Sequence, residues 1–588
     1  MHSLVQPNEW VVLRLPSDTL KVLQIVPNTI VSLGKYGTFS SNLVLERPYN
    51  LTYELLDREA GQKDSGLRIV PASELHADTI AEENAAANPV NDDKVVIGGD
   101  GVEFELVAEN GEVIMRSNRE TIDDSARQTL TMEEIETLKQ EGTGAGKDLI
   151  AKLMLSHTAL DQKTTFSLAK YKLLKTKKYL RRFTILPMDV PMLTYWMMEE
   201  KDAAKIFEMR DEMLALVGCW ANVHYSVAPN PEASETGGRW LMVDETGGLL
   251  VAAMAERMGI LYPPQDAPRS LYPTEAQEKE EQALQTSAHS PDGFRTSLAS
   301  TNTLTLLHNN AQPNLSLLKY FNFAVDTPNP THPLTAHLHT LSWLQLISPE
   351  LDTTYSTPPV SHTPEELLAM KSGKRGTYYR KHRRWARTKS IVDSTRNGSF
   401  SGLVVASAMD PVSILRHTIP LLAGGAPISI YSPTIEPLTA LADFYSTSRR
   451  TAFIQAPPAG FEELSSGEKE QWQGDEDFPL NPTLVLGASI QTSRVRNWQV
   501  LPGRTHPEMT GRGGAEGYLF TGIKVLPAEG KVEARGKYRK KKAENEDKTA
   551  TIKTEENGAG PEAKKRRIDA DLAEVKAERD TRMEDVSQ

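Results

Sequence analysis

The sequence predicts an α/β protein in which a small, barrel-like β-rich domain precedes a doubly wound domain with long insertions. Short runs of strand-forming residues, separated by glycines and a Pro-Asn pair, fill residues 1–55. Strand-like and helix-like segments alternate over residues 183–262 and again over 401–527, which is the pattern of a doubly wound sheet. Residues 263–400 interrupt this alternation with polar, proline-containing sequence, so we interpret them as an irregular insertion.

The β-rich domain should include a hairpin around Asn110-Gly111, because both residues of this dipeptide tolerate the positive φ of a tight turn. The end of the chain is polar and charged, which predicts disorder. The expected segments are 1–125 (β-rich domain), 126–182 (helical basic connector), 183–262 (first part of the doubly wound domain), 263–400 (irregular insertion), 401–527 (second part of that domain) and 528–588 (disordered charged tail).

Composition excludes some classes of protein. The 588 residues carry a formal net charge of -12 and contain no run of about eighteen apolar residues, so we expect no membrane span. Cys219 is the chain's one cysteine, which makes an internal disulfide impossible and favours the cytosol or the nucleus. Its apolar neighbours in LALVGCWANV predict a buried, unreactive thiol.

A basic stretch between Lys163 and Arg182 is the first candidate for function. It holds eight Lys/Arg in twenty residues, with no acid and with aromatic side chains interleaved. Lysines reach phosphates and aromatic rings stack on unpaired bases, so nucleic acid is the expected partner; a solvated helix face is the alternative. The candidate RNA-binding residues are Lys163, Lys170, Tyr171, Lys172, Lys175, Lys177, Lys178, Tyr179, Arg181 and Arg182.

Two further basic segments lie later in the chain. Residues 371–389 hold nine Lys/Arg together with Tyr378, Tyr379, His382 and Trp385, which favours RNA binding; a solvated loop or an import signal is the alternative. A cluster of four consecutive Lys and Arg residues in the C-terminal tail favours nuclear localisation, with non-specific contact to polyanions as the alternative. The candidates are Arg380, Lys381, Arg383 and Arg384 for RNA, and Lys564, Lys565, Arg566 and Arg567 for nuclear import.

The segment RWLMVDETGGLLVAAMAERMG has the strand, acid, glycine and helix layout of a nucleotide or S-adenosylmethionine loop. Its loop residues are Asp244, Gly247, Gly248 and Leu249. Bulky side chains follow the two glycines at once, which favours packing of the helix on the sheet over contact with a ligand. We therefore expect a degenerate cofactor loop and no bound cofactor.

No convincing catalytic set occurs elsewhere. The histidines of THPLTAHLHT, His332, His337 and His339, suggest a metal site only weakly because no acid lies near them in the sequence, and we expect no metal.

Three sequence blocks resemble one family closely. They are VVLRLPSDTLKVLQIVPNTIVSLGKYGTFSSN with ERPYNLTYEL, then KTTFSLAKYKLLKTKKY through LMVDETGGLLVAAMAERMG, and finally RNWQVLPGRTHPEMTGRGGAEGYLFTGIKV. The chain resembles the non-catalytic subunit of the eukaryotic tRNA (adenine-N1)-methyltransferase that modifies the T-loop adenosine, over about residues 9–262 and 400–525.

The resemblance implies a β-barrel domain and a Rossmann-like, methyltransferase-type domain. It also implies a catalytic partner subunit that holds S-adenosylmethionine, assembly as a heterotetramer and tRNA binding by this chain. Residues 498–509 are a candidate interface with the partner, or else a structural turn. Two alternatives stay open: an RNA-binding factor in translation initiation, and an active S-adenosylmethionine-dependent methyltransferase with an atypical loop.

Overall fold

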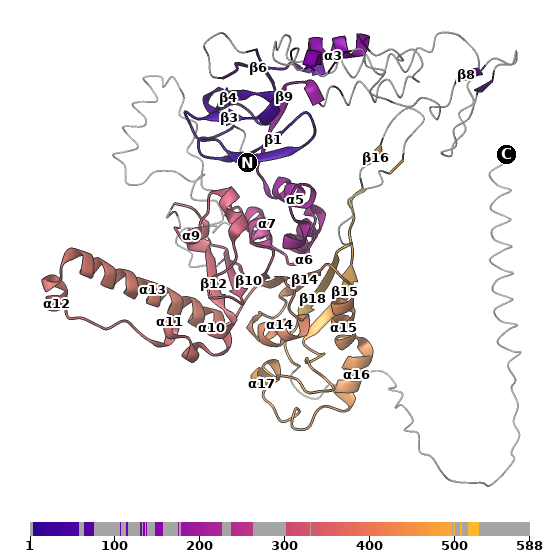
Figure 1. The fold of residues 1–588 in the computed structure, drawn as a ribbon. Helices are drawn as coiled ribbons and strands as arrows, with labels where there is room; N and C mark the ends of the chain where they lie inside the picture. Colours follow the sequence, from indigo (N-terminus) through magenta and orange to yellow (C-terminus); the bar gives the residue numbers. More distant parts are fainter. Residues whose placement is uncertain are drawn as a thin grey trace, which may run out of the picture. The chain divides into compact units, whose positions relative to one another are not determined.

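In the computed structural model the strands and helices form a small N-terminal sheet and a large central sheet (Figure 1). The structure describes residues 4–57, 64–75, 106–107, 113–115, 130–131, 133–135, 137, 147–156, 175, 178–225, 237–262, 301–327, 329, 331–496, 498–499, 506–507 and 516–528.

The N-terminal sheet is antiparallel and has the strand order β2-β1-β9-β5-β6. Alternate residues, such as Val11 and Leu13 of β1, point into a core that also holds Phe39 of the separate hairpin β3–β4. This confirms the β-rich domain. The strands are β1 (Trp10–Arg14), β2 (Leu20–Gln24), β3 (Ile30–Ser32), β4 (Thr38–Ser40), β5 (Thr52–Leu55), β6 (Leu67–Ile69) and β9 (Arg182–Pro187).

Strand β9 corrects one expected boundary, because we assigned residues 183–187 to the doubly wound domain. It pairs instead with β1 and β5, so the chain returns to the N-terminal sheet after the connector. The Phe183 ring stacks on Phe39 with centroids 4.9 Å apart, which fixes the strand in the N-terminal core. The local sequence RFTILP shows that a strand forms but not which sheet it joins.

The central sheet has seven strands in the order β12-β11-β10-β13-β14-β18-β15. The first five strands are parallel, and β18 runs antiparallel to both of its neighbours. The strand order reverses between β10 and β13, which defines a Rossmann-like, doubly wound domain as predicted. The strands are β10 (Arg239–Asp244), β11 (Thr303–His308), β12 (Leu338–Ser342), β13 (Gly402–Ala406), β14 (Pro427–Ser432), β15 (Val485–Gln491) and β18 (Tyr518–Lys524).

Helices cover both faces of this sheet. Met242 belongs to one buried cluster whereas Leu241 and Val243 belong to the other, as the two-residue period of a strand requires. The first cluster also includes Val12 and Leu20, so the two sheets share a continuous core. The first face carries α5 (Val190–Glu199), α6 (Asp211–Trp220), α7 (Leu249–Met258) and η8 (Ser316–Phe321); the second carries α10 (Trp343–Ile347), α14 (Pro411–Thr418) and α15 (Glu436–Phe444).

The expected irregular insertion, 263–400, is wrong in part because it contains two strands of the central sheet. β11 is the apolar run TLTLLH, which is buried on both faces as parallel strands are. The same region contains α13 (Ser372–Arg396), a helix of 25 residues, where we expected an irregular segment. The surface of this helix is polar, so its sequence lacks the apolar periodicity from which a helix is predicted.

Two smaller expectations are also corrected. Cys219 is exposed at the end of α6, not buried, because the helix presents its apolar face through Val217 and Leu214 instead. Residues 221–225, whose sequence ANVHY is strand-like within the expected alternation of strands and helices, instead form a turn and an irregular segment. The hairpin prediction is confirmed by the antiparallel pairing of β7 (Leu106–Val107) with β8 (Val113–Met115), although Asn110 and Gly111 lie outside the described residues.

Candidate nucleic-acid interface

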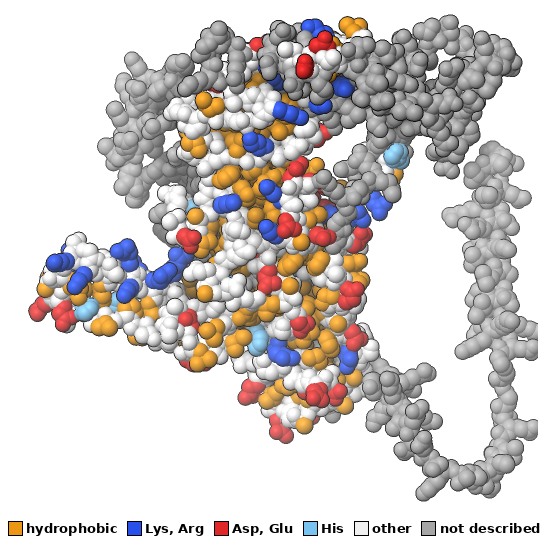
Figure 2. Space-filling model, in the orientation of Figure 1, with side chains coloured by type: hydrophobic (Ala, Val, Ile, Leu, Met, Phe, Trp, Pro, Cys, Tyr) orange, Lys and Arg blue, Asp and Glu red, His pale blue; other side chains and the backbone are white. Residues whose placement is uncertain are grey.

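The longest basic surface among the described residues is helix α13. It extends away from the central sheet, with α12 (Pro364–Ala369) at its far end (Figure 1). Figure 2 shows Lys and Arg side chains gathered along this arm. The four predicted residues, Arg380, Lys381, Arg383 and Arg384, all lie on α13 and are exposed.

The charges of α13 have few local partners. In the part of the chain that the structure describes, no carboxylate lies within ion-pair distance of a Lys or Arg between 374 and 389. Arg380 and Arg383 donate to backbone carbonyls one turn earlier, at 3.3 and 3.4 Å, and Arg380 also donates to the Thr377 hydroxyl at 3.4 Å; all of these partners are uncharged. The helix therefore presents a strip of uncompensated positive charge, which attracts a polyanion.

The C-terminal part of α13 anchors the arm to the domain. Trp385 donates its indole N–H to the Tyr355 carbonyl at 3.0 Å, and the Tyr355 hydroxyl donates to Asp393 at 2.7 Å. Val392 and Thr395 are buried against the sheet. The arm is thus held at one end while its cations remain in solvent.

The structure describes only part of the first basic stretch, Lys163–Arg182. Lys178 is exposed and places its ammonium 5.3 Å from the centre of the Tyr179 ring, which is half-buried and packs against the cluster that holds Leu149 and Leu153. Lys175 is half-buried. Lys163, Lys170, Tyr171, Lys172 and Lys177 lie outside the described residues.

Two residues predicted to contact RNA are committed to protein partners instead. The Arg182 side chain is 8% exposed and lies 3.8 Å from Glu54 and 3.5 Å from Glu74. Arg181 forms an ion pair with Asp57. These pairs form because β9 brings both arginines beside strand β5, which the sequence did not reveal. Arg182 is therefore a structural residue of the N-terminal domain.

The degenerate cofactor loop lies at the carboxyl end of β10. The side chains of Asp244 and Thr246 accept hydrogen bonds from backbone amides of the loop and of the start of α7. Asp244 accepts from the Thr246 amide at 2.7 Å and the Thr246 hydroxyl at 2.5 Å through Oδ1, and from the Val251 amide at 3.0 Å through Oδ2. The Leu250 amide donates to the Thr246 hydroxyl at 3.1 Å. Donors at the start of α7, which would otherwise bind an anionic ligand, are thus already used.

Burial sets the ionisation of Asp244. Removal from water raises the pKa of this carboxyl, and the hydrogen bonds from Thr246 and Val251 lower the pKa in part. The carboxylate acts as an internal cap for α7.

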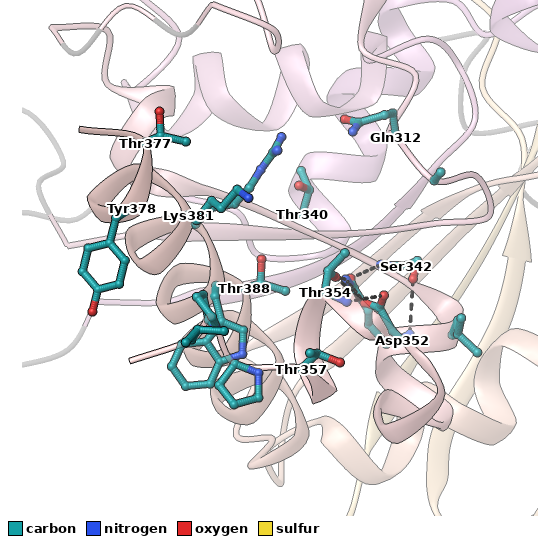
Figure 3. Close-up of a pocket in the computed structure, with 18 of the residues that line it drawn as sticks. Gln312, Thr340, Ser342, Asp352, Thr354, Thr357, Thr377, Tyr378, Lys381 and Thr388 are labelled. Carbon is teal, nitrogen blue, oxygen red and sulfur yellow. Dashed lines mark hydrogen bonds between the residues drawn. The ribbon is translucent and has the colours of Figure 1, made fainter. Parts of the chain in front are cut away.

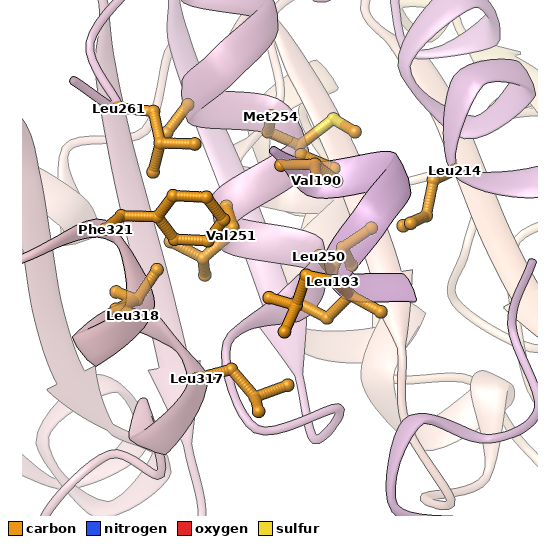
Figure 4. Close-up of a cluster of buried hydrophobic side chains, with 14 of the residues drawn as sticks. Val190, Leu193, Leu214, Leu250, Val251, Met254, Leu261, Leu317, Leu318 and Phe321 are labelled. Atoms are coloured by element: carbon orange, nitrogen blue, oxygen red, sulfur yellow. The ribbon is translucent and has the colours of Figure 1, made fainter. Parts of the chain in front are cut away.

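The outer side of the loop is covered by η8. Leu317 donates its amide to the Gly247 carbonyl at 3.0 Å, and a Cβ added to Gly248 would lie 3.2 Å from Leu315. Figure 4 shows Leu317, Leu318 and Phe321 packed beside Leu250 and Val251 of α7. Thr246, Gly247, Gly248 and Leu249 are all buried. The four predicted loop residues therefore come together but present no surface to a ligand.

The neighbouring crevice, where the strand order reverses, is bridged by Glu245. Its carboxylate accepts from the Ser407 hydroxyl at 2.8 Å, the Ala408 amide at 2.9 Å and the Asn309 side chain at 2.6 Å. It links the ends of β10, β11 and β13, the place where Rossmann-like domains bind ligands. Glu245 could not be recognised from the sequence, because its partners are more than sixty residues away.

The remaining candidates form no site within the described residues. His332 and His337 hydrogen-bond to the Phe321 and Asn302 carbonyls at 3.0 and 2.8 Å. No group of three His, Cys, Asp or Glu that could hold a metal occurs within the described ranges. None of the helices described there is long and apolar enough to cross a membrane. Lys564, Lys565, Arg566 and Arg567 lie outside the described residues.

The strand order and the filled loop define a Rossmann-like protein whose ligand loop is closed by its own chain. The chain belongs to the Gcd10p family, whose model matches residues 4–371.

Curated relatives extend over nearly the whole chain. A protein of Aspergillus fumigatus is 47% identical over 580 residues, covering 95% of this chain and 99% of its own. One of Schizosaccharomyces pombe is 27% identical over 555 residues, covering 94% and 98%. Each is named as the non-catalytic subunit of tRNA (adenine(58)-N(1))-methyltransferase.

Solved structures give weaker likenesses. A SAM-dependent O-methyltransferase of Thermotoga maritima shares 8% identity and a TM-score of 0.36, covering 90% of this chain and 97% of its own. The tRNA (m1A58) methyltransferase TrmI of Aquifex aeolicus shares 9% identity and a TM-score of 0.34, covering 89% and 100%. The fold class therefore rests on the strand order of this chain itself.

Proposed function

We propose that this chain is the non-catalytic, tRNA-binding subunit of a tRNA (adenine-N1)-methyltransferase complex that methylates the T-loop adenosine. The names of relatives that match along more than nine-tenths of the chain support the complex. The main support for a non-catalytic role is that Leu315, Leu317 and Leu318 pack against the loop at Gly247 and Gly248 and leave no space for a ligand.

The residues of this loop do not fit S-adenosylmethionine. A methyl donor needs backbone that it can approach and amide donors that are free, whereas here the loop is buried and Asp244 and Thr246 take the donors. Glu245 bridges the adjacent crevice. The cofactor therefore belongs to a catalytic partner subunit, and this chain contributes by holding substrate.

The exposed cations support the role in tRNA binding. Helix α13 offers lysines and arginines without carboxylate partners, next to Tyr378, Tyr379 and Trp385. Cations that neutralise phosphates give affinity with little dependence on sequence. Such a surface suits a subunit that positions a folded RNA while another chain carries out the reaction.

The proposal also includes assembly of the complex as a heterotetramer and its location in the nucleus. Two heterodimers would form a heterotetramer, and an obligate interface buries on the order of 2,000 Å² or more. Trp498, on the short strand β16 (Trp498–Gln499), is 58% exposed and is a candidate contact for the partner. Light scattering on the purified complex tests the mass. Replacing Lys564, Lys565, Arg566 and Arg567 with alanine tests nuclear import of a fluorescent fusion.

Co-expression with the catalytic subunit, followed by methylation of tRNA with each subunit omitted, tests the function. We expect methyl transfer only when both chains are present. Substantial transfer by this chain alone would show an active enzyme, and co-purification with initiation complexes instead of a methyltransferase would indicate a translation factor.

A further inference from the structure

A groove of about 1160 Å³ lies between α13 and the carboxyl edge of the central sheet. One wall is α13, and the other comprises the ends of β11 and β12 with the segment 352–362. Figure 3 shows Thr377, Lys381 and Thr388 on the helix and Thr340 and Ser342 on the sheet side. This volume exceeds that of most small-molecule pockets, so a ligand longer than one small molecule matches the space.

The cationic side of the groove is one face of the helix. Lys374, Lys381 and Arg384 line it, at spacings of seven and three residues, which fall on the same side of an α-helix. A rise of 1.5 Å per residue spreads them along about 15 Å of the axis. A ligand with several separated anionic groups therefore matches this face better than one with a single charge.

The one acidic residue in the lining is already occupied. Asp352 accepts from the Thr354 amide and hydroxyl at 3.0 and 2.5 Å, and from the Gln345 side chain at 2.7 Å. Its charge is thus shared among internal donors, and the groove stays positive overall.

Besides the cations, the lining offers hydroxyls and aromatic rings, together with apolar side chains that include Leu344, Val360 and Met370. Hydroxyl groups can donate to phosphate oxygens and to the ribose 2′-OH, and aromatic rings can stack on unpaired bases. Trp385 is held in place by its hydrogen bond to Tyr355, and the Tyr378 ring lies 4.7 Å from His382. The hydroxyl-bearing residues are Thr340, Ser342, Thr354, Thr357, Thr377, Tyr378 and Thr388.

We propose that this groove binds an unpaired stretch of RNA, with its phosphates on Lys374, Lys381 and Arg384 and its bases against Tyr378 and Trp385. A duplex keeps its bases stacked inside and cannot present them to these rings. An acidic protein segment is the competing occupant; hydroxyls outnumber apolar anchors on the helix wall, which favours RNA. The inference rests on the proposed function and adds which part of an RNA this chain contacts.

Binding of a fluorescent oligouridylate and of an RNA duplex to the full-length chain tests the proposal by anisotropy. The variant K381A/R384A removes two groove cations, and R380A/R383A removes the same charge from the side of the helix that does not line the groove. We expect the groove variant to bind oligouridylate about tenfold more weakly, because charge-assisted hydrogen bonds are the strong ones. Its salt slope should fall by about 1.4, or roughly 0.7 for each phosphate that the two cations no longer neutralise.

The control variant should weaken oligouridylate binding by less than about threefold, because its cations add to the positive field of the helix but do not line the groove. Circular dichroism shows that both variants retain the helix. A 4-thiouridine crosslink to Tyr378 or Trp385 would support the proposal independently. It is overturned by equal losses in the two variants, by displacement of oligouridylate by polyglutamate at matched charge, or by crosslinks confined to other elements. Those outcomes leave the subunit-omission assay untouched, so failure of the groove and failure of the proposed function are distinguishable.

Discussion

Gly248→Ala probes the filled loop directly, because Gly248 has φ +94° and its added Cβ would lie 3.2 Å from Leu315 Cα and 3.4 Å from Leu318 Cγ. A non-glycine residue in the left-handed region costs about 1–2 kcal/mol. Forcing a methyl group into a packed core costs about 1–3 kcal/mol more. The variant should therefore lose about 2–5 kcal/mol of local stability.

Gly425→Ala is the matched control. Gly425 has φ +86°, close to that of Gly248, but nothing lies within 4 Å of its added Cβ. It should show only the backbone cost of about 1–2 kcal/mol. The difference between the two variants isolates the packing of η8 against the loop.

Hydrogen exchange of the amides in α7 measures the opening free energy of this region, and urea denaturation gives the global value. We expect α7 in the Gly248 variant to exchange faster than in the Gly425 variant by about 1–3 kcal/mol of opening free energy. Equal effects of the two substitutions would mean that the loop has free space and could admit a cofactor.

Three more predictions concern burial and charge. Glu54→Ala removes the buried carboxylate that Arg182 and Arg68 share, and it leaves Arg182 only the partly exposed Glu74, 3.5 Å away. It should destabilise the N-terminal domain by about 3 kcal/mol in urea denaturation, whereas removing the exposed Asp443 partner of Arg449 should cost under about 1 kcal/mol; similar losses would refute the buried pair. Because burial raises the pKa of Asp244 above 3.8, the folded chain binds its proton more readily than the unfolded chain, so this group's contribution to stability should fall as pH rises from 3.8 through the folded value. Asp244→Asn should remove that part of the pH dependence, and an unchanged profile would contradict the assignment. Cys219 should react with a thiol reagent in the native isolated chain, with Cys219→Ser as the blank, and protection until denaturation would show that it is buried.

Local sequence predicted much of the central sheet. The runs at β10, β13 and β14 are apolar and bounded by turn residues, and Leu249 and Leu250 after the two glycines indicated a packed loop. These features depend on neighbours in the chain, so periodicity and composition are enough to find them.

Features that depend on distant partners were not predictable. The leucines of η8 that cover the loop come about seventy residues later, and the Glu54 partner of Arg182 comes 128 residues earlier. Helix α13 has charges around most of its circumference and only a few anchoring residues, such as Trp385 and Val392, so no apolar stripe marked it as a helix. The many Lys and Arg residues of 371–389 indicated a nucleic-acid site from the sequence alone. The groove beside the helix could be recognised only in the folded structure.

The number of S-adenosylmethionine molecules bound per heterodimer decides whether the methyl donor resides in the partner subunit alone. Calorimetry on the purified complex should give one site per heterodimer, and the chain alone should show no saturable binding, because Leu315, Leu317 and Leu318 fill the loop at Gly247 and Gly248. Two sites per heterodimer, or saturable binding by this chain alone, would contradict a closed loop and a non-catalytic role.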